Sequence, residues 1–227
     1  MNTHIIKQWQ GVFGNVIHKS ESITDLLPGN DLKIEIALLN LGYEGIVNIQ
    51  DISESALSDI DEAVITYQAK FAIRKYNSNA LEQVKDADAI VGNHIIDDIL
   101  SYNFCREKNL DPDMLLQDVE FSYKIWRDIA NQKFCDSFEL TRKVLDNAFE
   151  SLHNNGYIIL SSYQSRFERE HDFMHETRLC SRIMRELIVY SKSLQNISVI
   201  DAESFLMEKP AVYEEWLLIQ RNREFIR

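Results

Sequence analysis

Short apolar runs alternate with helical patterns along most of the chain, and this alternation restricts the fold more than any other feature. Five runs have the length and the β-branched or aliphatic composition of buried strands: residues 23–27, 45–49, 69–74, 87–91 and 156–161. Between them, apolar residues recur at intervals of three and four, as in amphipathic helices: residues 31–41, a stretch behind Ser53, a stretch from about Ile95, and residues 111–126, 136–152 and 171–192. Strands and helices in this order require a parallel sheet with helices on both faces.

Two further apolar runs lie near the C-terminus, at residues 197–200 and 213–220. The link between them contains a proline and has no room for a crossover helix, so the two runs are expected to form an antiparallel pair. The patterns therefore predict a doubly wound α/β fold with an antiparallel last strand.

Length and composition narrow the class of protein. The 227 residues fit a single domain, 1–227, and the net charge of −12 disfavours nucleic acid and anionic membrane surfaces as partners. The N-terminal residues contain no long apolar run, so neither a signal peptide nor a membrane span is expected, and a cytoplasmic location is the default. Three widely spaced cysteines without a CxxC motif argue against a disulfide framework or a zinc site: Cys105, Cys135 and Cys180.

The loop after the first predicted strand, residues 25–31 (DLLPGND), is a candidate ligand loop because a doubly wound sheet binds ligands at this position. Gly29 would let the backbone approach a ligand closely. Asp51 lies 22 residues beyond Gly29, a spacing that suits a carboxylate accepting from two ribose hydroxyls. An ordinary Pro-Gly turn and a solvated acid would explain the same residues.

Residues 23–57 (ITDLLPGNDLKIEIALLNLGYEGIVNIQDISESAL) resemble the opening of the class I S-adenosylmethionine (SAM)-dependent methyltransferases, whose fold is Rossmann-like. Members of this family begin with a strand, the motif D/E-x-G-x-G-x-G, a helix, and a second strand that ends in an acid. The acid of the motif falls on Asp25, its middle glycine on Gly29, and the ribose-binding acid on Asp51.

Two positions depart from this motif. Leu27 replaces the first glycine, where it would crowd the methionine moiety of the cofactor. Asp31 replaces the third glycine, where its charge would favour a cationic ligand or cap the helix. The resemblance implies SAM as cofactor, bound by the residues that match the family: Asp25, Pro28, Gly29, Asn30, Asp51, Ile52 and Asn93.

A second block, residues 88–94 (DAIVGNH), resembles the family's fourth strand and the loop after it, where cofactor and substrate meet. His94 can take a proton near neutral pH, so it is the candidate catalytic base. Asp97 and Asp98 follow one helical turn later, and could orient His94 or bind a substrate amine. A part-buried or helix-capping histidine and two acids that complement the helix dipole are the alternatives. These three residues have side chains that can bind a divalent metal, but no further ligand clusters beside them in the sequence, so no metal site is predicted.

A third block, Tyr157–Leu160 followed by residues 161–164 (SSYQ), extends the resemblance over nearly the whole chain. It implies seven strands in the order 3-2-1-4-5-7-6, with the terminal pair supplying strands six and seven. Tyr163 is expected to face the rim of the site, where its hydroxyl would bind substrate or complete a structural hydrogen bond.

Roughly 60 residues separate the fourth and fifth predicted strands, which is more than a crossover needs. Residues 102–134 are therefore expected to be a helical insertion that could form a lid. Its aromatic residues could line a pocket or belong to the core: Phe121, Tyr123 and Trp126. Nine acids within residues 86–120 would favour a neutral or cationic substrate, unless they form a solvated face.

The patterns and the resemblance leave three functions open, and nothing in the sequence specifically favours the third. The first is a SAM-dependent methyltransferase acting on a small molecule, with no nucleic-acid or membrane partner; the sequence leaves a homo-oligomer open. The second is a non-catalytic binding or partner protein with the methyltransferase fold, prompted by Leu27 and Asp31. The third is an enzyme of this fold with another reaction or nucleotide, although the phosphate-binding motif GxxxxGK[ST] is absent.

Overall fold

The computed structural model describes residues 3–17, 20–28, 32–53, 57–58, 60, 69–112 and 114–222. Seven strands form one sheet, in the order β3-β2-β1-β4-β5-β7-β6. Strands β1 to β5 pair in parallel, whereas β7 runs antiparallel to both β5 and β6. The predicted α/β fold, its strand order and its antiparallel last strand are thus confirmed. The strands are β1 (Ser22–Leu26), β2 (Ile46–Asp51), β3 (Ala72–Asn77), β4 (Ala87–Asn93), β5 (Leu152–Ser162), β6 (Ile197–Ile200) and β7 (Glu215–Arg221).

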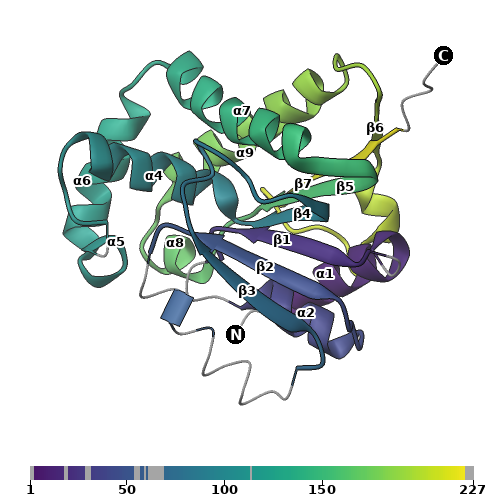
Figure 1. Cartoon of the computed structure of the whole chain (residues 1–227). Helices are drawn as coiled ribbons and strands as arrows, with labels where there is room; N and C mark the ends of the chain where they lie inside the picture. Colours follow the sequence, from purple (N-terminus) through teal and green to yellow (C-terminus); the bar gives the residue numbers. More distant parts are fainter. Residues whose placement is uncertain are drawn as a thin grey trace.

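Helices cover both faces of the sheet (Figure 1). Helices α4, α6, α7 and α9 share one apolar core with the sheet, and α1 and α2 share a second core on the opposite face. The longer helices are α1 (Thr3–Val16), α2 (Lys33–Asn40), α4 (Ile95–Glu107), α6 (Val119–Ala130), α7 (Phe134–Ser151) and α9 (Met174–Ser191). The short ones are α5 (Met114–Gln117), α8 (Arg166–Glu170) and the 3-10 helix η1 (Ala202–Phe205).

Strand β1 contributes to both cores because successive side chains of a strand point to opposite faces of the sheet. Ile23 belongs to the core under α1 and α2, whereas Leu26 belongs to the core under α4 and α7; both are fully buried. This two-sided burial explains why apolar residues of the strand occupy positions that point to both faces. By the same alternation, Asp25 lies on the face of Ile23, toward α2.

Helix α1 is the main element that the predictions did not include. Its buried residues recur at helical spacing, and Trp9 stacks edge-on against Trp216 of β7 with ring centroids 4.9 Å apart. Gly11 lies so close to η1 that a Cβ atom there would be 2.4 Å from the carbonyl oxygen of Phe205. Helix α1 thus packs between the sheet and the segment before β7.

The predicted helix start at Asp111-Pro112 is wrong for the main helix of this region. The short α5 ends at Gln117, and α6 begins after Asp118, whose carboxylate accepts hydrogen bonds from the backbone N–H groups of Glu120 and Phe121. The chain therefore changes direction at Asp118 and does not run as one helix from residue 111. As a consequence, Tyr123 does not share the buried face of Trp126 but is 44% exposed.

Other boundaries shift by a few residues. The third strand begins at Ala72 rather than at residue 69, and α9 begins at Met174 after the separate helix α8. Of the helix predicted behind Ser53, only residues 57, 58 and 60 are described, and Leu57 and Ile60 are buried. The remaining predicted positions, Val64 and Tyr67 among them, lie outside the described residues.

Candidate functional site

The site lies at the carboxyl ends of β1, β2 and β4. Strand β1 pairs with β2 on one side and with β4 on the other, so the strand order reverses between β1 and β4. In doubly wound sheets, ligands bind in the crevice at such a switch point. The strands bring Asp25, Asp51 and Asn93 to this edge, as the sequence predicted from their positions.

The loop between β1 and α2 is described in part. Pro28 is buried, whereas Gly29, Asn30 and Asp31 lie outside the described residues. Leu27 is 8% exposed and has a left-handed backbone, with φ of 53°. A non-glycine residue in this conformation costs about 1–2 kcal/mol, so the backbone here has a form that glycine adopts more readily. The resemblance to the methyltransferases aligns this position with the first glycine of their motif.

Asp51 and Ile52 end β2 beside a small cavity. Asp51 is 3% exposed, and its Oδ1 accepts a hydrogen bond of 2.8 Å from the Ser53 backbone N–H. Ile52 lines the cavity with Leu27 and Asp98, and the enclosed volume of about 20 Å³ has room for roughly one water molecule.

Asn93 and Tyr163 are held by other side chains. The amide oxygen of Asn93 accepts from Trp9 Nε1 at 2.9 Å and from the Ser161 hydroxyl at 3.3 Å, and its amide nitrogen donates to the Tyr163 hydroxyl at 3.1 Å. Tyr163 is only 5% exposed, so its ring lies inside the protein rather than at an open rim. The network joins α1 to β4 and β5 directly beneath the site.

His94 bridges two carboxylates. Its Nδ1 lies 2.7 Å from Asp97 Oδ2, and its Nε2 lies 2.6 Å from the carbonyl oxygen of Tyr163 and 3.1 Å from Glu168 Oε2. Glu168 also accepts from the Thr177 hydroxyl at 3.1 Å. Both ring nitrogens face acceptors, and this arrangement favours the imidazolium form of His94. The contacts join the start of α4 to α8 and, through Glu168 and Thr177, to α9.

The charges explain the protonation of this bridge. Burial lowers the pKa of His94, but the charge of Asp97 and the hydrogen bonds with Asp97 and Glu168 outweigh it and raise the pKa well above its usual value. Burial raises the pKa of Glu168, but the contacts with His94 and the hydrogen bonds with Ser165 together lower it below its usual value. The backbone of His94 is left-handed, with φ of 60°, a conformation that requires support from its surroundings.

Further carboxyl groups surround the bridge. Burial and nearby carboxylates raise the pKa of Asp98 and of Glu176 well above their usual values. Lys33, at the start of α2, lies 5.6 Å from the centre of the Tyr163 ring, and burial lowers its pKa to about 8 against the opposing charges of Asp97 and Asp98. Among the described residues at this edge of the sheet, acidic groups therefore outnumber the basic side chains, His94 and Lys33.

A second pair of carboxyl groups lies under the loop, where Asp25 is 1% exposed and Glu35 is 4% exposed. None of their four oxygens accepts a hydrogen bond of normal geometry from any described residue. Burial, followed by the charge and hydrogen bond of Glu35, raises the pKa of Asp25 well above its usual value.

Several residues of the site were not predicted from the sequence: Trp9, Lys33, Glu35, Glu168 and Glu176. The sequence does contain a signal for Glu168: Ser165 and Glu168 are three residues apart, as in a capping box, and they form one at the start of α8. The sequence contains no signal that Lys33 and Glu35 belong to the site, because polar residues within an amphipathic helical pattern normally face solvent.

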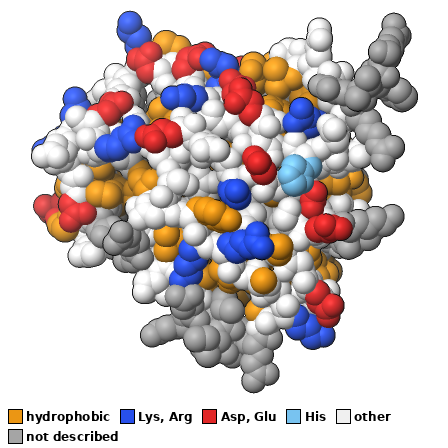
Figure 2. All heavy atoms as spheres, viewed as in Figure 1, with side chains coloured by type: hydrophobic (Ala, Val, Ile, Leu, Met, Phe, Trp, Pro, Cys, Tyr) orange, Lys and Arg blue, Asp and Glu red, His pale blue; other side chains and the backbone are white. Residues whose placement is uncertain are grey.

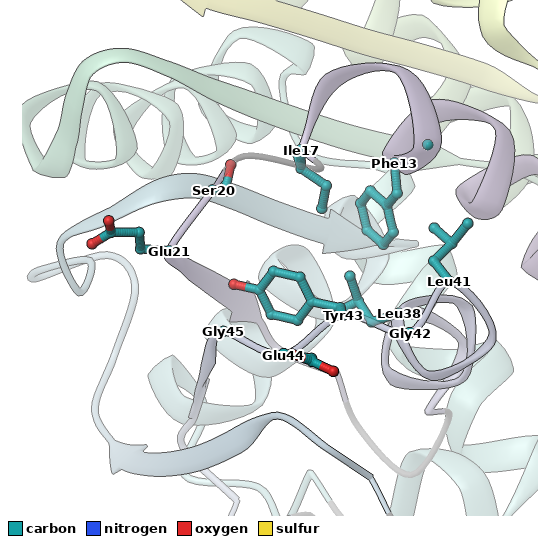
Figure 3. Close-up of a pocket in the computed structure, with 11 residues that line it drawn as sticks. Phe13, Ile17, Ser20, Glu21, Leu38, Leu41, Gly42, Tyr43, Glu44 and Gly45 are labelled. Carbon is teal, nitrogen blue, oxygen red and sulfur yellow. The ribbon is translucent and has the colours of Figure 1, made fainter.

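A larger cavity, of about 620 Å³, lies at the opposite edge of the sheet (Figure 3). Phe13 and Ile17 of the α1 region and Leu41 at the end of α2 border it, with Tyr43 and Glu44 from the turn before β2. It contains none of the residues at the carboxyl ends of the strands, so the chemistry of the switch point is separate from it.

The surface carries charges of both signs. On the face shown in Figure 2, acidic and basic side chains lie intermixed, and no continuous basic stripe of the kind that follows a nucleic-acid backbone crosses its described part. No helix among the described residues is both long and apolar enough to cross a membrane. Over the same part of the chain, no three or more His, Cys, Asp and Glu side chains are grouped so as to hold a metal ion.

The raised pKa values of His94, Asp98 and Glu176 predict that the protein without bound cofactor loses stability as the pH rises above neutral. His94 stabilises the fold below its unfolded pKa of about 6.5, and this contribution disappears as the pH rises through its raised pKa. Asp98 and Glu176 bind more protons in the folded than in the unfolded state, so they too lower the free energy of unfolding as the pH rises. The melting temperature is expected to be higher at about pH 6 than at about pH 8.5.

Two variants on α9 test the origin of this slope. Glu176→Gln removes a buried carboxyl group and is expected to flatten the pH dependence, whereas Glu186→Gln, at an exposed position on the same helix, is expected to leave it unchanged. If the melting temperature of Glu176→Gln changed with pH as steeply as that of the wild type, Glu176 would not contribute to the pH dependence of stability.

Comparisons with known proteins identify the fold. No protein-family model matches the sequence, and no curated protein matches it. Three solved structures share 11% identity with it. An O-methyltransferase family protein from Burkholderia thailandensis has a TM-score of 0.56 over 97% of this chain and 56% of its own length. The plantazolicin methyltransferase BpumL in complex with SAH has a TM-score of 0.56, over 97% of this chain and 84% of its own length.

The third structure, the N-methyltransferase NodS from Bradyrhizobium japonicum, gives a TM-score of 0.51 over 98% of this chain and 96% of its own. This chain thus spans little more than half of the first protein and nearly all of the third. At such identities the likeness shows the class I methyltransferase fold, and the named acceptor atoms, O and N, differ among the matches.

Proposed function

We propose that this protein is a SAM-dependent methyltransferase acting on a small molecule. The observation that carries the proposal is the position of Asp25 and Asp51, two buried carboxyl groups at the carboxyl ends of adjacent strands, at the switch point of a class I methyltransferase sheet. Structures with this fold include one in complex with SAH, the demethylated product of SAM.

The residues present fit a cationic nucleoside. SAM carries a sulfonium and an ammonium group, and the orphaned carboxyl groups of Asp25 and Glu35 would complement positive charge. Asp51 would accept from the ribose hydroxyls, and the chain around Pro28, Gly29 and Asn30 would hold the methionine end. Ile52 would pack against the adenosine.

When bound, SAM supplies an electrophilic methyl group, so the protein mainly has to align a nucleophile and exclude water. We assign this alignment to Asp97 and Asp98 at the start of α4, with Asn93 and Tyr163 fixing the strands below them. The excess of carboxyl groups favours a neutral or cationic acceptor, such as an amine, over an anionic one.

His94 has two candidate roles. As the general base predicted from the sequence, it would have to lose its proton and release Asp97 or Glu168. As a positioning residue, it keeps the proton and fixes both carboxylates around the acceptor. The geometry favours the positioning role, because both of its ring nitrogens face acceptors within the protein.

Calorimetric titration of the purified, cofactor-free protein with SAM tests the proposal. We expect saturable binding, and a rise in melting temperature that increases with SAM concentration; at 100 times the dissociation constant the stabilisation is about 2.7 kcal/mol. ATP serves as the control nucleotide. The absence of any SAM binding would contradict the proposed function.

A non-catalytic protein with this fold is the second candidate, and Leu27 is the observation that favours it. Its side chain occupies the position of a family glycine and lines the small cavity at the end of β2. Leu27→Gly restores the glycine without changing charge. SAM binding by Leu27→Gly but not by the wild type would favour the non-catalytic function.

A further inference from the structure

Helix α1 contributes one buried hydrogen bond to the edge of the sheet at which the site lies. Trp9 is fully buried, and its indole Nε1 donates to the amide oxygen of Asn93 at 2.9 Å. Asn93 ends β4 at the switch point, 84 positions further along the chain. The bond therefore links α1 to a residue of the proposed cofactor site.

Trp9 decides which end of the Asn93 amide faces α1. An indole N–H group can only donate, so the amide oxygen has to face it. The other two partners are hydroxyl groups: Ser161 lies 3.3 Å from the amide oxygen, and Tyr163 lies 3.1 Å from the amide nitrogen. A hydroxyl group can donate or accept, so both are compatible with either orientation of the amide. Among these described partners, only Trp9 fixes the amide nitrogen on the side of Tyr163.

This orientation leaves one N–H group of Asn93 for a ligand. The amide nitrogen carries two hydrogens, of which one is donated to the Tyr163 hydroxyl, and no described residue accepts the other. Asn93 is buried, and buried amide N–H groups are normally paired, so an oxygen of a bound ligand would complete the pairing. Lys33 lies 5.6 Å from the centre of the Tyr163 ring, and its positive charge favours a ligand oxygen that carries negative charge.

The strand register places Asn93 beside the loop that follows β1. Asp25 of β1 is the partner of Val91 of β4, so the same register continued by two residues brings Leu27 level with Asn93. Under the proposed function, the chain beyond Leu27 holds the methionine end of SAM. That end carries a carboxylate, which accepts N–H groups.

We propose that Trp9 is a positioning residue of the cofactor site: by holding the amide oxygen of Asn93, it directs an N–H group at the carboxylate of the methionine moiety of SAM. This inference rests on the proposed function, since it requires SAM as the ligand. Helix α1 then sets part of the affinity for SAM without touching it. The chemical group recognised through Trp9 is an amino-acid carboxylate.

Trp9→Phe keeps an aromatic ring in the core and removes the indole donor. We expect it to weaken SAM binding about three- to tenfold, as is usual when two residues of one hydrogen-bond network are uncoupled. 5′-Methylthioadenosine keeps the nucleoside but lacks the amino and carboxyl groups, so its affinity should not change. Calorimetric titration with each ligand, at a temperature at which the variant is folded, measures the effect.

Trp216 provides a matched control. It is also buried, packs against Trp9, and donates from its indole Nε1 to Glu214 at 2.9 Å, but this bond does not lead to the site. Trp216→Phe is expected to lower the melting temperature as Trp9→Phe does, and to bind SAM with the affinity of the wild type.

A double-mutant cycle tests whether Trp9 acts through Asn93. In an Asn93→Ala background, Trp9→Phe is expected to have no further effect on the affinity for SAM, because the group that it positions is absent. A further loss of affinity in this background, as large as in the wild type, would overturn the inference.

The wild-type protein allows a second measurement that does not depend on a variant's folding. Its three tryptophans give three indole N–H signals in a ¹⁵N–¹H spectrum. Binding of a carboxylate by Asn93 polarises its amide, so SAM is expected to shift the signal of Trp9 more than 5′-methylthioadenosine does. The signal of Trp216 is expected to respond equally to both ligands. A Trp9 signal that responds equally to both would overturn the inference.

The outcomes separate this inference from the proposed function. Unchanged SAM affinity of Trp9→Phe would overturn the inference and leave the methyltransferase proposal intact. Equal weakening for SAM and 5′-methylthioadenosine, or the same loss in Trp216→Phe, would also overturn it, because Trp9 would then only support the fold. No binding of SAM to the wild type would overturn both.

Discussion

Replacement of His94 by alanine is expected to lower the free energy of unfolding by about 3–5 kcal/mol, the usual cost of removing one partner from a buried ion pair. The variant leaves Glu168, 3% exposed, and Asp97, 17% exposed, without the imidazolium between them. For a chain of this size the melting temperature should fall by roughly 6–20 °C. Thermal unfolding at about pH 6, where His94 is charged, measures the effect.

A second histidine provides a matched control. His153 also pairs with an aspartate, at 3.0 Å from Asp88, but the two side chains are 53% and 32% exposed. Exposed pairs contribute about 0–1 kcal/mol, so His153→Ala should change the melting temperature little. His94→Gln keeps one donor for Asp97 or Glu168 and is expected to be less destabilised than His94→Ala.

The same variants distinguish the two roles of His94. A general base contributes about 100- to 10,000-fold to turnover, so the catalytic role predicts that His94→Gln loses activity at low temperature while remaining folded and binding SAM. The positioning role predicts that His94→Gln retains much of the activity of the wild type per folded molecule. If His94→Ala were as stable as the wild type, the contacts of His94 with Asp97 and Glu168 would not stabilise the fold.

Asp51→Ala is expected to weaken SAM binding at least tenfold. A hydrogen bond between a ribose hydroxyl and a carboxylate contributes about 1.5–3 kcal/mol, and the loss of about 1.4 kcal/mol corresponds to a factor of ten. Asp51→Asn should keep the hydrogen bond from the Ser53 backbone N–H and therefore the local fold, while losing the charge that attracts the cofactor. Calorimetric titration with SAM measures both variants.

A control variant for the loss of charge at Asp51 is available at the opposite edge of the sheet. Glu44→Gln also removes one negative charge, but Glu44 is 69% exposed and borders the larger cavity. It is expected to bind SAM as the wild type does. If a folded Asp51→Asn or Asp51→Ala protein bound SAM with unchanged affinity, Asp51 would have no part in the cofactor site.

The strands were predictable where local pattern and burial agree. Residues 87–91 and 197–200 were recognised as strands because both are short β-branched or aliphatic runs between turn residues. Both pair in the sheet, the first in its buried centre and the second at its partly exposed edge. The antiparallel end of the sheet followed from the short link alone. A helical turn does follow Asp111-Pro112, but α5 ends at Gln117 and the longer helix begins after Asp118, so the prediction of one helix from residue 111 to residue 126 was wrong.

The sequence by itself determined which polar residues reach the carboxyl ends of the strands, because strand ends are a local property: Asp25, Asp51, Asn93 and His94. Their partners were decided only by the tertiary structure. His94 meets Glu168 across 74 positions, and Asn93 meets Trp9 across 84. The reach and direction of a side chain toward another element depend on how helices pack on the sheet, which no local pattern contains.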